Sequence, residues 1–157
     1  MTRLITQHTL AELTHAAQES PRLRKNLNFH TSNDSVCHRL LNALEPGTYV
    51  APHRHLHAEK DETMMVMSGS FGVLLFDEQG VITETVVLSQ TRGSLGITIP
   101  AGVFHSMVAL ESGSIFFESK AGPYAALAEQ ERAQWAPAEG DPGCVVYLQN
   151  MTAQFAE

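Results

Sequence analysis

Short apolar segments at regular spacing are the feature that most restricts how this chain can fold. Between residues 36 and 120 they alternate with turn sequences such as EPG at 45–47, SGS at 68–70 and DEQG at 77–80. Clusters of Gly, Pro, Asp and Ser between short apolar runs mark tight turns between strands. The pattern predicts a mainly β protein, built as an antiparallel sandwich or a small barrel.

Helices are expected near the two ends of the chain. Thr9 and Glu12 have the spacing of a capping box, and Leu10, Leu13 and Ala17 share one face of the segment that follows. A second helix is expected over 124–135, and a last edge strand over 144–148. The other expected strands cover 36–44, 49–57, 62–67, 71–76, 81–88, 97–99, 104–110 and 115–120.

The length of 157 residues suits a single domain. We expect residues 1–35 to form an N-terminal helical extension packed on a β-barrel domain of residues 36–150. Ten Lys and Arg against 17 Asp and Glu give a formal net charge of −7, which argues against nucleic acid or an anionic membrane as partner. No secretory leader or bilayer-spanning run is recognised, and Cys37 and Cys144 form no CxxC pair, so we expect a cytoplasmic protein.

The histidines carry the clearest functional signal. Three of the eight lie in PHRHLH at 52–57. In an extended strand, side chains two positions apart face the same side, so His53, His55 and His57 can all face one cavity. Alternating histidines also occur on solvated strands, but Glu62 at the start of the next strand and His105 after the Pro100-Ala-Gly turn favour a divalent metal site.

These residues also carry a resemblance to a known family. Gly47, His53, His55, Glu62 and Gly69, followed by Pro100, Gly102 and His105, resemble the two cupin motifs. The resemblance implies an antiparallel jelly-roll barrel that holds one ion in its mouth. Segments 21–30, 41–49, 52–55, 60–63 and 122–124 further resemble the WbuC-type cupin-fold metalloproteins, which are typically encoded near O-antigen or polysaccharide genes.

Two alternatives for the histidine pair stay open. Six residues separate His55 from Glu62, more than the cupin motif has, and only the His55/His57 pair gives the usual spacing. The distance from Gly47 and the Ala-Pro-His context favour His53 with His55 instead. We therefore predict a metal held by His53, His55, Glu62 and His105, with His57 as a neighbour or a replacement for His53.

Three imidazoles and one carboxylate leave Fe, Mn, Ni, Co and Zn open as the bound divalent ion. Four protein ligands on an ion that prefers six leave two adjacent positions, which suits a hydroxy-acid or a sugar diol. Candidate residues for binding such a small molecule are Arg22, Arg24, Arg39 and Tyr49, although the first two arginines also fit internal salt bridges. Glu118 and Lys120 share one strand face and are expected to form a surface pair.

The favoured hypothesis is a metal-dependent isomerase, lyase or oxygenase acting on a small oxygenated molecule. Under the family resemblance, that molecule is a carbohydrate or a sugar-nucleotide. A non-catalytic ligand-binding or regulatory module is the alternative, and a metal-free sugar epimerase fits less well because the clustered histidines would have no role. A homodimer formed through edge strands is also expected.

Overall fold

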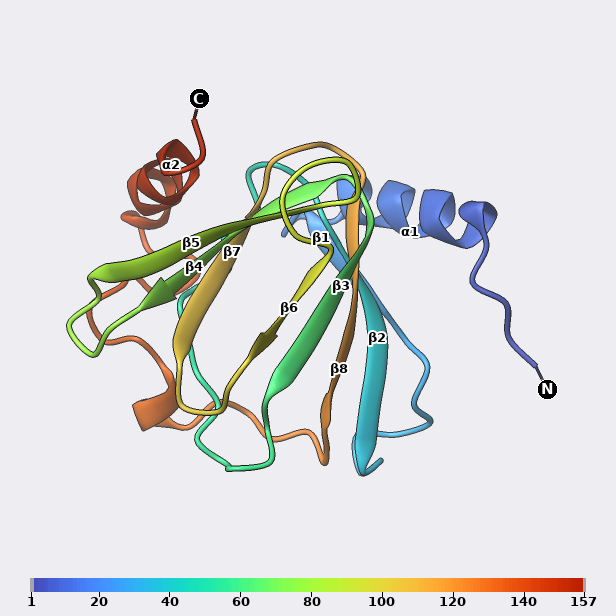
Figure 1. Cartoon of the computed structure of the whole chain (residues 1–157), viewed down its shortest axis with the longest axis horizontal. Helices are drawn as coiled ribbons and strands as arrows, with labels where there is room; N and C mark the ends of the chain where they lie inside the picture. The colour runs from blue at the N-terminus through green and yellow to red at the C-terminus, as the bar shows by residue number, and fades with distance from the viewer. Residues whose placement is uncertain (1, 157) are drawn as a thin grey trace.

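Two antiparallel sheets packed face to face form the body of the computed structural model, which describes residues 2–156 (Figure 1). The larger sheet has the strand order β1-β2-β8-β3-β6, and the smaller has β5-β4-β7. The mainly β, antiparallel jelly-roll class is confirmed, although the two sheets remain separate rather than forming one closed barrel across the described residues. The strands are β1 (Arg24–Asn28), β2 (Cys37–Leu44), β3 (Glu62–Ser68), β4 (Ser70–Phe76), β5 (Ile82–Ser89), β6 (Gly96–Ile99), β7 (Phe104–Ala109) and β8 (Ser114–Ala121).

Strand alternation fixes which side chains enter the space between the sheets. Along β3, Glu62, Met64 and Val66 are buried, whereas Met65 is exposed. The apolar members of this inward row pack with residues of the smaller sheet, and the rings of Phe71 and Phe116 meet edge to face at 5.2 Å. Burying a side chain of this size contributes about 1.5–3 kcal/mol, so the apolar part of the row can offset the cost of burying Glu62 at its end.

The outer face of the larger sheet is covered by α1 (Gln7–Glu19), which packs Leu10, Leu13 and Ala17 on it (Figure 1). The capping box predicted from Thr9 and Glu12 is wrong. Thr6 is the N-cap, and its hydroxyl accepts from the backbone N–H of Thr9 at 3.2 Å. The helix therefore begins earlier, and Glu12 lies beside His8 one turn back.

The C-terminal segment covers the outer face of the smaller sheet. Two expectations are wrong here: 124–135 is irregular apart from the 3-10 turn η1 (Glu129–Glu131), and the expected edge strand at 144–148 is the start of α2 (Cys144–Ala153). A helix packs better here than a strand would, because it places Cys144 and Met151 on one buried face. Gly72 makes room for this packing, since a Cβ there would lie 2.3 Å from the ring of Phe155.

Two further segments differ from expectation. Residues 24–28 form β1, an edge strand that was not predicted. The strand expected over 49–57 is reduced to one residue, His53, whose backbone bridges to both His105 and Arg132. This segment leaves the larger sheet after β2, meets β7 of the smaller sheet through the single bridge at His53, and returns to the larger sheet at β3. Among the described residues, no helix is long and apolar enough to cross a membrane.

The C-terminal segment is fixed to the β-sheets by polar contacts around Glu139. Arg22 donates to both carboxylate oxygens, at 2.8 and 2.7 Å, and Arg24 donates to one of them at 2.7 Å. Tyr49 donates its hydroxyl to the carbonyl of Pro137 at 2.7 Å. The hydrogen bond from Arg22, reinforced by Arg24, lowers the pKa of Glu139 to about 2 against burial.

We predict that Glu139→Gln lowers the free energy of unfolding by about 1 kcal/mol at pH 7, because the Glu139 side chain is 39% exposed and solvent screens the ion pairs. The contribution is present above the ordinary pKa of 4.5 and is lost as pH falls toward about 2. Urea unfolding from pH 7 to pH 3 should therefore show the two proteins converging in acid. Glu12→Gln, on the exposed face of α1, is the matched control, and an equal loss for both variants would contradict the role of Glu139.

Candidate metal centre

Backbone pairing between distant segments brings the two histidine motifs together. The N–H of His53 donates to the carbonyl of His105 at 3.0 Å, and the N–H of His105 donates back at 2.9 Å. The N–H of Gly102 donates to the carbonyl of His55 at 2.7 Å, so the turn before β7 also rests on the same segment. These bonds explain why residues about fifty positions apart in the sequence share one site.

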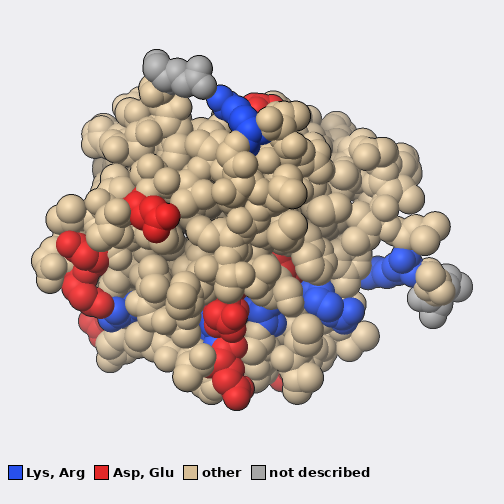
Figure 2. All heavy atoms as spheres, in the orientation of Figure 1, with Lys and Arg blue, Asp and Glu red and all other residues tan. Residues whose placement is uncertain are grey.

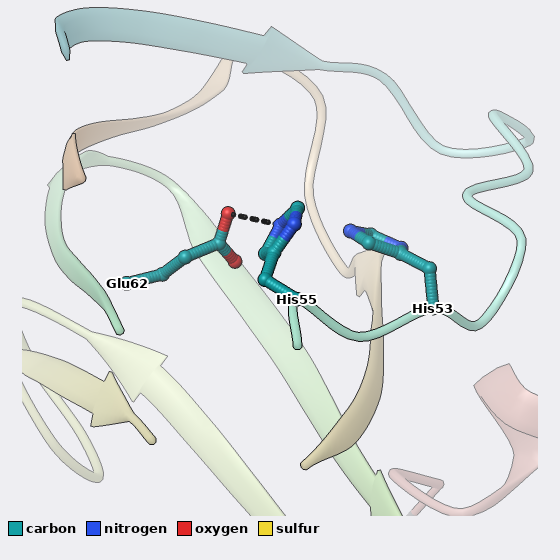
Figure 3. Close-up of side chains that lie close together, drawn as sticks. All are labelled: His53, His55 and Glu62. Carbon is teal, nitrogen blue, oxygen red and sulfur yellow. Dashed lines mark hydrogen bonds and ion pairs between the residues drawn. The ribbon is translucent and has the colours of Figure 1, made fainter. Parts of the chain in front are cut away.

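Glu62 completes the cluster from the opposite sheet. It is the first residue of β3, is 3% exposed, and pairs in register with Lys120 on β8 and Ile99 on β6. Its Oε1 lies 2.9 Å from Nε2 of His55, and its Oε2 lies 2.9 Å from Nε2 of His105 (Figure 3 shows the first contact). The carboxylate thus joins the two sheets at the end of the sandwich.

Ligand atoms of His53, His55 and Glu62 all lie within 4.8 Å of one another, as a shared metal ion requires. Figure 3 shows the three side chains converging, with His53 and His55 side by side and Glu62 facing them. The ring of His105 lies 4.6 Å from that of His53, centroid to centroid. The structure therefore groups His53, His55 and Glu62 and places His105 directly against Glu62 and His53.

The orientation of two imidazoles is set by backbone carbonyls. Nδ1 of His53 donates to the carbonyl of Ala51 at 3.0 Å, and Nδ1 of His105 donates to the carbonyl of Val103 at 2.9 Å. A carbonyl can only accept, so the proton of each neutral ring is on Nδ1 and Nε2 keeps its lone pair. Metal-binding histidines are commonly fixed in this way.

The surroundings of Nε2 of His105 indicate whether these residues are suited to bind a cation. This nitrogen is buried and has no hydrogen-bond partner among the described residues, yet it faces Oε2 of Glu62 at 2.9 Å. Two acceptors at this distance repel unless a proton or a metal ion lies close to both. With nitrogen and carboxylate donors together, the donor set fits a divalent transition metal.

Electrostatics keep the cluster in the protonation states that a metal needs. Burial alone would raise the pKa of Glu62, but a proton shared with Nε2 of His105, the hydrogen bond from His55 and the ammonium of Lys120 lower it well below its usual range. Burial, with His105 nearby, lowers the pKa of His53 to about 4. At neutral pH the carboxyl is therefore ionised and His53 is neutral, which are the ligand forms that bind metals.

The remaining candidate residues lie elsewhere. His57 is exposed and outside the cluster. Arg22 and Arg24 are joined to Glu139, and Tyr49 is buried against the C-terminal segment. Arg39 is exposed on β2, at a position that alternates with the inward-facing Leu40. The structure does not bring the four substrate candidates, Arg22, Arg24, Arg39 and Tyr49, to the metal cluster.

The expectation that Glu118 and Lys120 form a surface pair is wrong. Their side chains are 8% and 25% exposed, and Nζ of Lys120 lies 2.6 Å from Oε1 of Glu118. Nζ also lies 2.9 Å from Oε1 of Glu62. The sequence held a usable signal, because Lys120 occupies the inward alternation of a strand that pairs with β3.

A cavity of about 560 Å³ lies beside the cluster. It is bounded by His53 on one side and by the C-terminal segment on the other, with Tyr124, Arg132 and Asp141 among its polar residues. In Figure 2, most charged side chains of the face drawn lie in its lower half, toward the end where β3 begins and β8 ends. The volume is in the range of small-molecule sites, roughly 300–1,000 Å³.

Comparison with known families gives a family assignment. The profile of the family described as "Domain of unknown function (DUF6016)" matches residues 5–88, more than half of the chain. The chain belongs to this family. The region matched to DUF6016 contains His53, His55 and Glu62 and ends before His105. No curated protein matches this DUF6016 chain.

Solved structures share the fold of this DUF6016 protein. KdgF from Halomonas sp. is 22% identical with a TM-score of 0.51, over 68% of this chain and 85% of the other. TT1209 from Thermus thermophilus is 20% identical with a TM-score of 0.53, over 76% and 97%. A cupin superfamily protein from Desulfitobacterium hafniense is 11% identical with a TM-score of 0.49, over 62% and 76%.

At these identities the likeness concerns the fold alone. The WbuC subtype stays a prediction.

We predict that His105→Ala abolishes stoichiometric metal binding. The substitution removes one proposed ligand, Nε2 of His105, and leaves Oε2 of Glu62 without the nitrogen that faces it. The loss should exceed the roughly 10–100-fold that removing an outer partner costs. Isothermal titration with Co²⁺ or Zn²⁺ measures it. In thermal melts, metal at a hundred times the wild-type Kd should stabilise the wild type by about 2.7 kcal/mol and leave the variant unchanged.

His57→Ala is the matched control, since His57 is exposed and separate from the cluster. It should bind metal as the wild type does. Equal loss of metal in His57→Ala and in His53→Ala would show instead that the segment 53–57 binds with another pair of histidines.

Proposed function

We propose that this protein is a metal-dependent enzyme that acts on a small oxygenated molecule. The observation that carries the proposal is the buried convergence of Glu62 with the Nε2 lone pair of His105, next to His53 and His55. Lys120 compensates the carboxylate at Oε1, but the buried imidazole nitrogen that faces Oε2 is costly unless a proton or a metal ion lies close to both atoms. Because burying these polar groups lowers the stability of the fold, a functional role explains their presence better than a structural one.

His53, His55, Glu62 and His105 would hold one divalent ion. The ion would supply Lewis acidity toward a substrate oxygen and lower the pKa of bound water. His53 and His105 keep fixed ring orientations through Ala51 and Val103, so their contribution needs no reorganisation. His55 donates from Nε2 to Glu62 and would adopt the other tautomer to bind the ion through this atom.

The substrate class we propose is a sugar, sugar-nucleotide or hydroxy-acid with two neighbouring oxygens. The cavity beside His53 supports a ligand of monosaccharide size, and Arg132 at its wall supports an oxygen-rich or anionic one. The WbuC resemblance favours a role in O-antigen or polysaccharide metabolism. Isomerisation, lyase chemistry and oxygenation all remain within the proposal, as do the predicted homodimer and cytoplasmic location.

The experiment starts with untagged protein, because a His tag would bind metal itself. Elemental analysis by ICP-MS should give about one transition-metal ion per chain in the wild type and much less in His105→Ala. The loaded protein is then screened by NMR and mass spectrometry against sugars, sugar-nucleotides and hydroxy-acids. Turnover that is lost in His105→Ala and restored by metal only in the wild type is the expected result.

Two outcomes would contradict the proposal in different ways. A full metal complement with saturable binding of a panel member and unchanged ligand afterwards would establish a metal-dependent binding module instead of an enzyme. A wild-type chain that acquires no metal from Fe²⁺, Mn²⁺, Co²⁺, Ni²⁺ or Zn²⁺ would contradict the metal centre itself.

A further inference from the structure

Lys120 occupies a position that the proposed ligand set does not use. It lies on β8 directly opposite Glu62 on β3, and its ammonium is shared between two carboxylates. Nζ lies 2.9 Å from Oε1 of Glu62, whereas Nε2 of His105 lies 2.9 Å from Oε2. The two oxygens of Glu62 therefore have different neighbours. Oε1 accepts from the ammonium and also from Nε2 of His55 at 2.9 Å, whereas Oε2 faces Nε2 of His105. When His55 adopts the tautomer that can bind an ion, the ammonium is the donor that stays on Oε1.

Glu118 holds Lys120 in this place. It is two residues earlier on the same strand, faces the same interior, and lies 2.6 Å from Nζ through Oε1. Its Oε2 accepts a hydrogen bond from Nδ2 of Asn42 on β2 at 2.7 Å. A chain of polar contacts thus runs from Asn42 through Glu118 and Lys120 to Glu62, across three neighbouring strands.

The charges of this chain of contacts favour a cation nearby. Two carboxylates and one ammonium leave one net negative charge within a part of the sandwich where Glu62 and Glu118 are 3% and 6% exposed. A buried net charge is stable only with a compensating partner. Without Glu118, Lys120 and Glu62 would neutralise each other, and the excess negative charge next to the metal position would be lost.

We propose that Lys120, held by Glu118, is a positioning residue that occupies Oε1 of Glu62 and limits Glu62 to one metal bond through Oε2. This inference rests on the proposed metal site and specifies how many positions on the ion stay open. A carboxylate can bind an ion through one or both oxygens, and the second bond would use a position otherwise open to substrate. Keeping Glu62 monodentate leaves room for two neighbouring substrate oxygens.

The experiment uses the full chain loaded with Co²⁺, whose visible spectrum reports coordination number. Acetohydroxamate, which binds through two oxygens, and azide, which binds through one atom, are the probes. The test variant is Lys120→Met with Glu118→Gln, because Lys120→Met alone would leave Glu118 buried without its partner. Glu118→Gln alone is the matched control, because its amide oxygen and Glu62 can both still accept from the ammonium and keep it next to Glu62. Lys120→Arg is the conservative variant.

We expect the double variant to bind Co²⁺, to show an altered visible spectrum, and to bind acetohydroxamate about tenfold or more weakly, the order of an outer-partner effect. Its azide affinity should change by less than about twofold. Glu118→Gln should keep the wild-type spectrum and acetohydroxamate affinity, and Lys120→Arg should restore most of both. Thermal melts of the metal-free proteins report folding separately.

An unchanged spectrum with unchanged acetohydroxamate affinity in the double variant would overturn the role of Lys120 while leaving the proposed function intact. Equal weakening of both probes would also overturn it, because a general loss of structure predicts that result. A wild-type chain that binds no Co²⁺ would overturn the proposed function and this inference together. If the double variant fails to fold, the Co²⁺ spectrum of Lys120→Gln decides in the same way.

Discussion

The reciprocal backbone hydrogen bonds between His53 and His105 are the contact on which the site depends. They attach an irregular segment to the start of strand β7, so that two motifs far apart in the sequence face each other. Strand alternation then aims Glu62 into the same space from the opposite sheet. Both the hydrogen bonds between His53 and His105 and the alternation of β3 are properties of the backbone. They therefore fix the positions from which the side chains of His53, His105 and Glu62 converge.

The same end of the sandwich holds two of the buried carboxylates among the described residues, whereas Glu45 is buried at the other end. Glu62 and Glu118 enter the interior at the end with the histidine cluster, whereas the next inward residues, Met64 and Phe116, belong to the apolar core. Lys120 stands between the two carboxylates. The apolar rows provide the stability that allows this polar cluster to persist, which is a common relation between scaffold and site.

The sequence predicted the parts of the fold that depend on local pattern, and it missed those that depend on packing. The spacing of short apolar runs and turns located β2 to β8 within a few residues. By contrast, the strand expected at 144–148 is the start of α2, which packs Cys144 and Met151 against residues of the smaller sheet. Glu139 shows the same limit, because nothing local indicates its contacts with Arg22 and Arg24.

For the site, the motif spacing identified His53, His55, Glu62 and His105, which the structure places together. The carbonyls of Ala51 and Val103 that fix two imidazoles, and the burial of Lys120, required the three-dimensional structure. Anomalous diffraction at the cobalt edge from Co²⁺-soaked crystals tests the central claim most directly. The account predicts one strong peak about 2.0–2.2 Å from Nε2 of His53 and His105 and from an oxygen of Glu62. Peaks confined to exposed histidines, with none in this cluster, would contradict it.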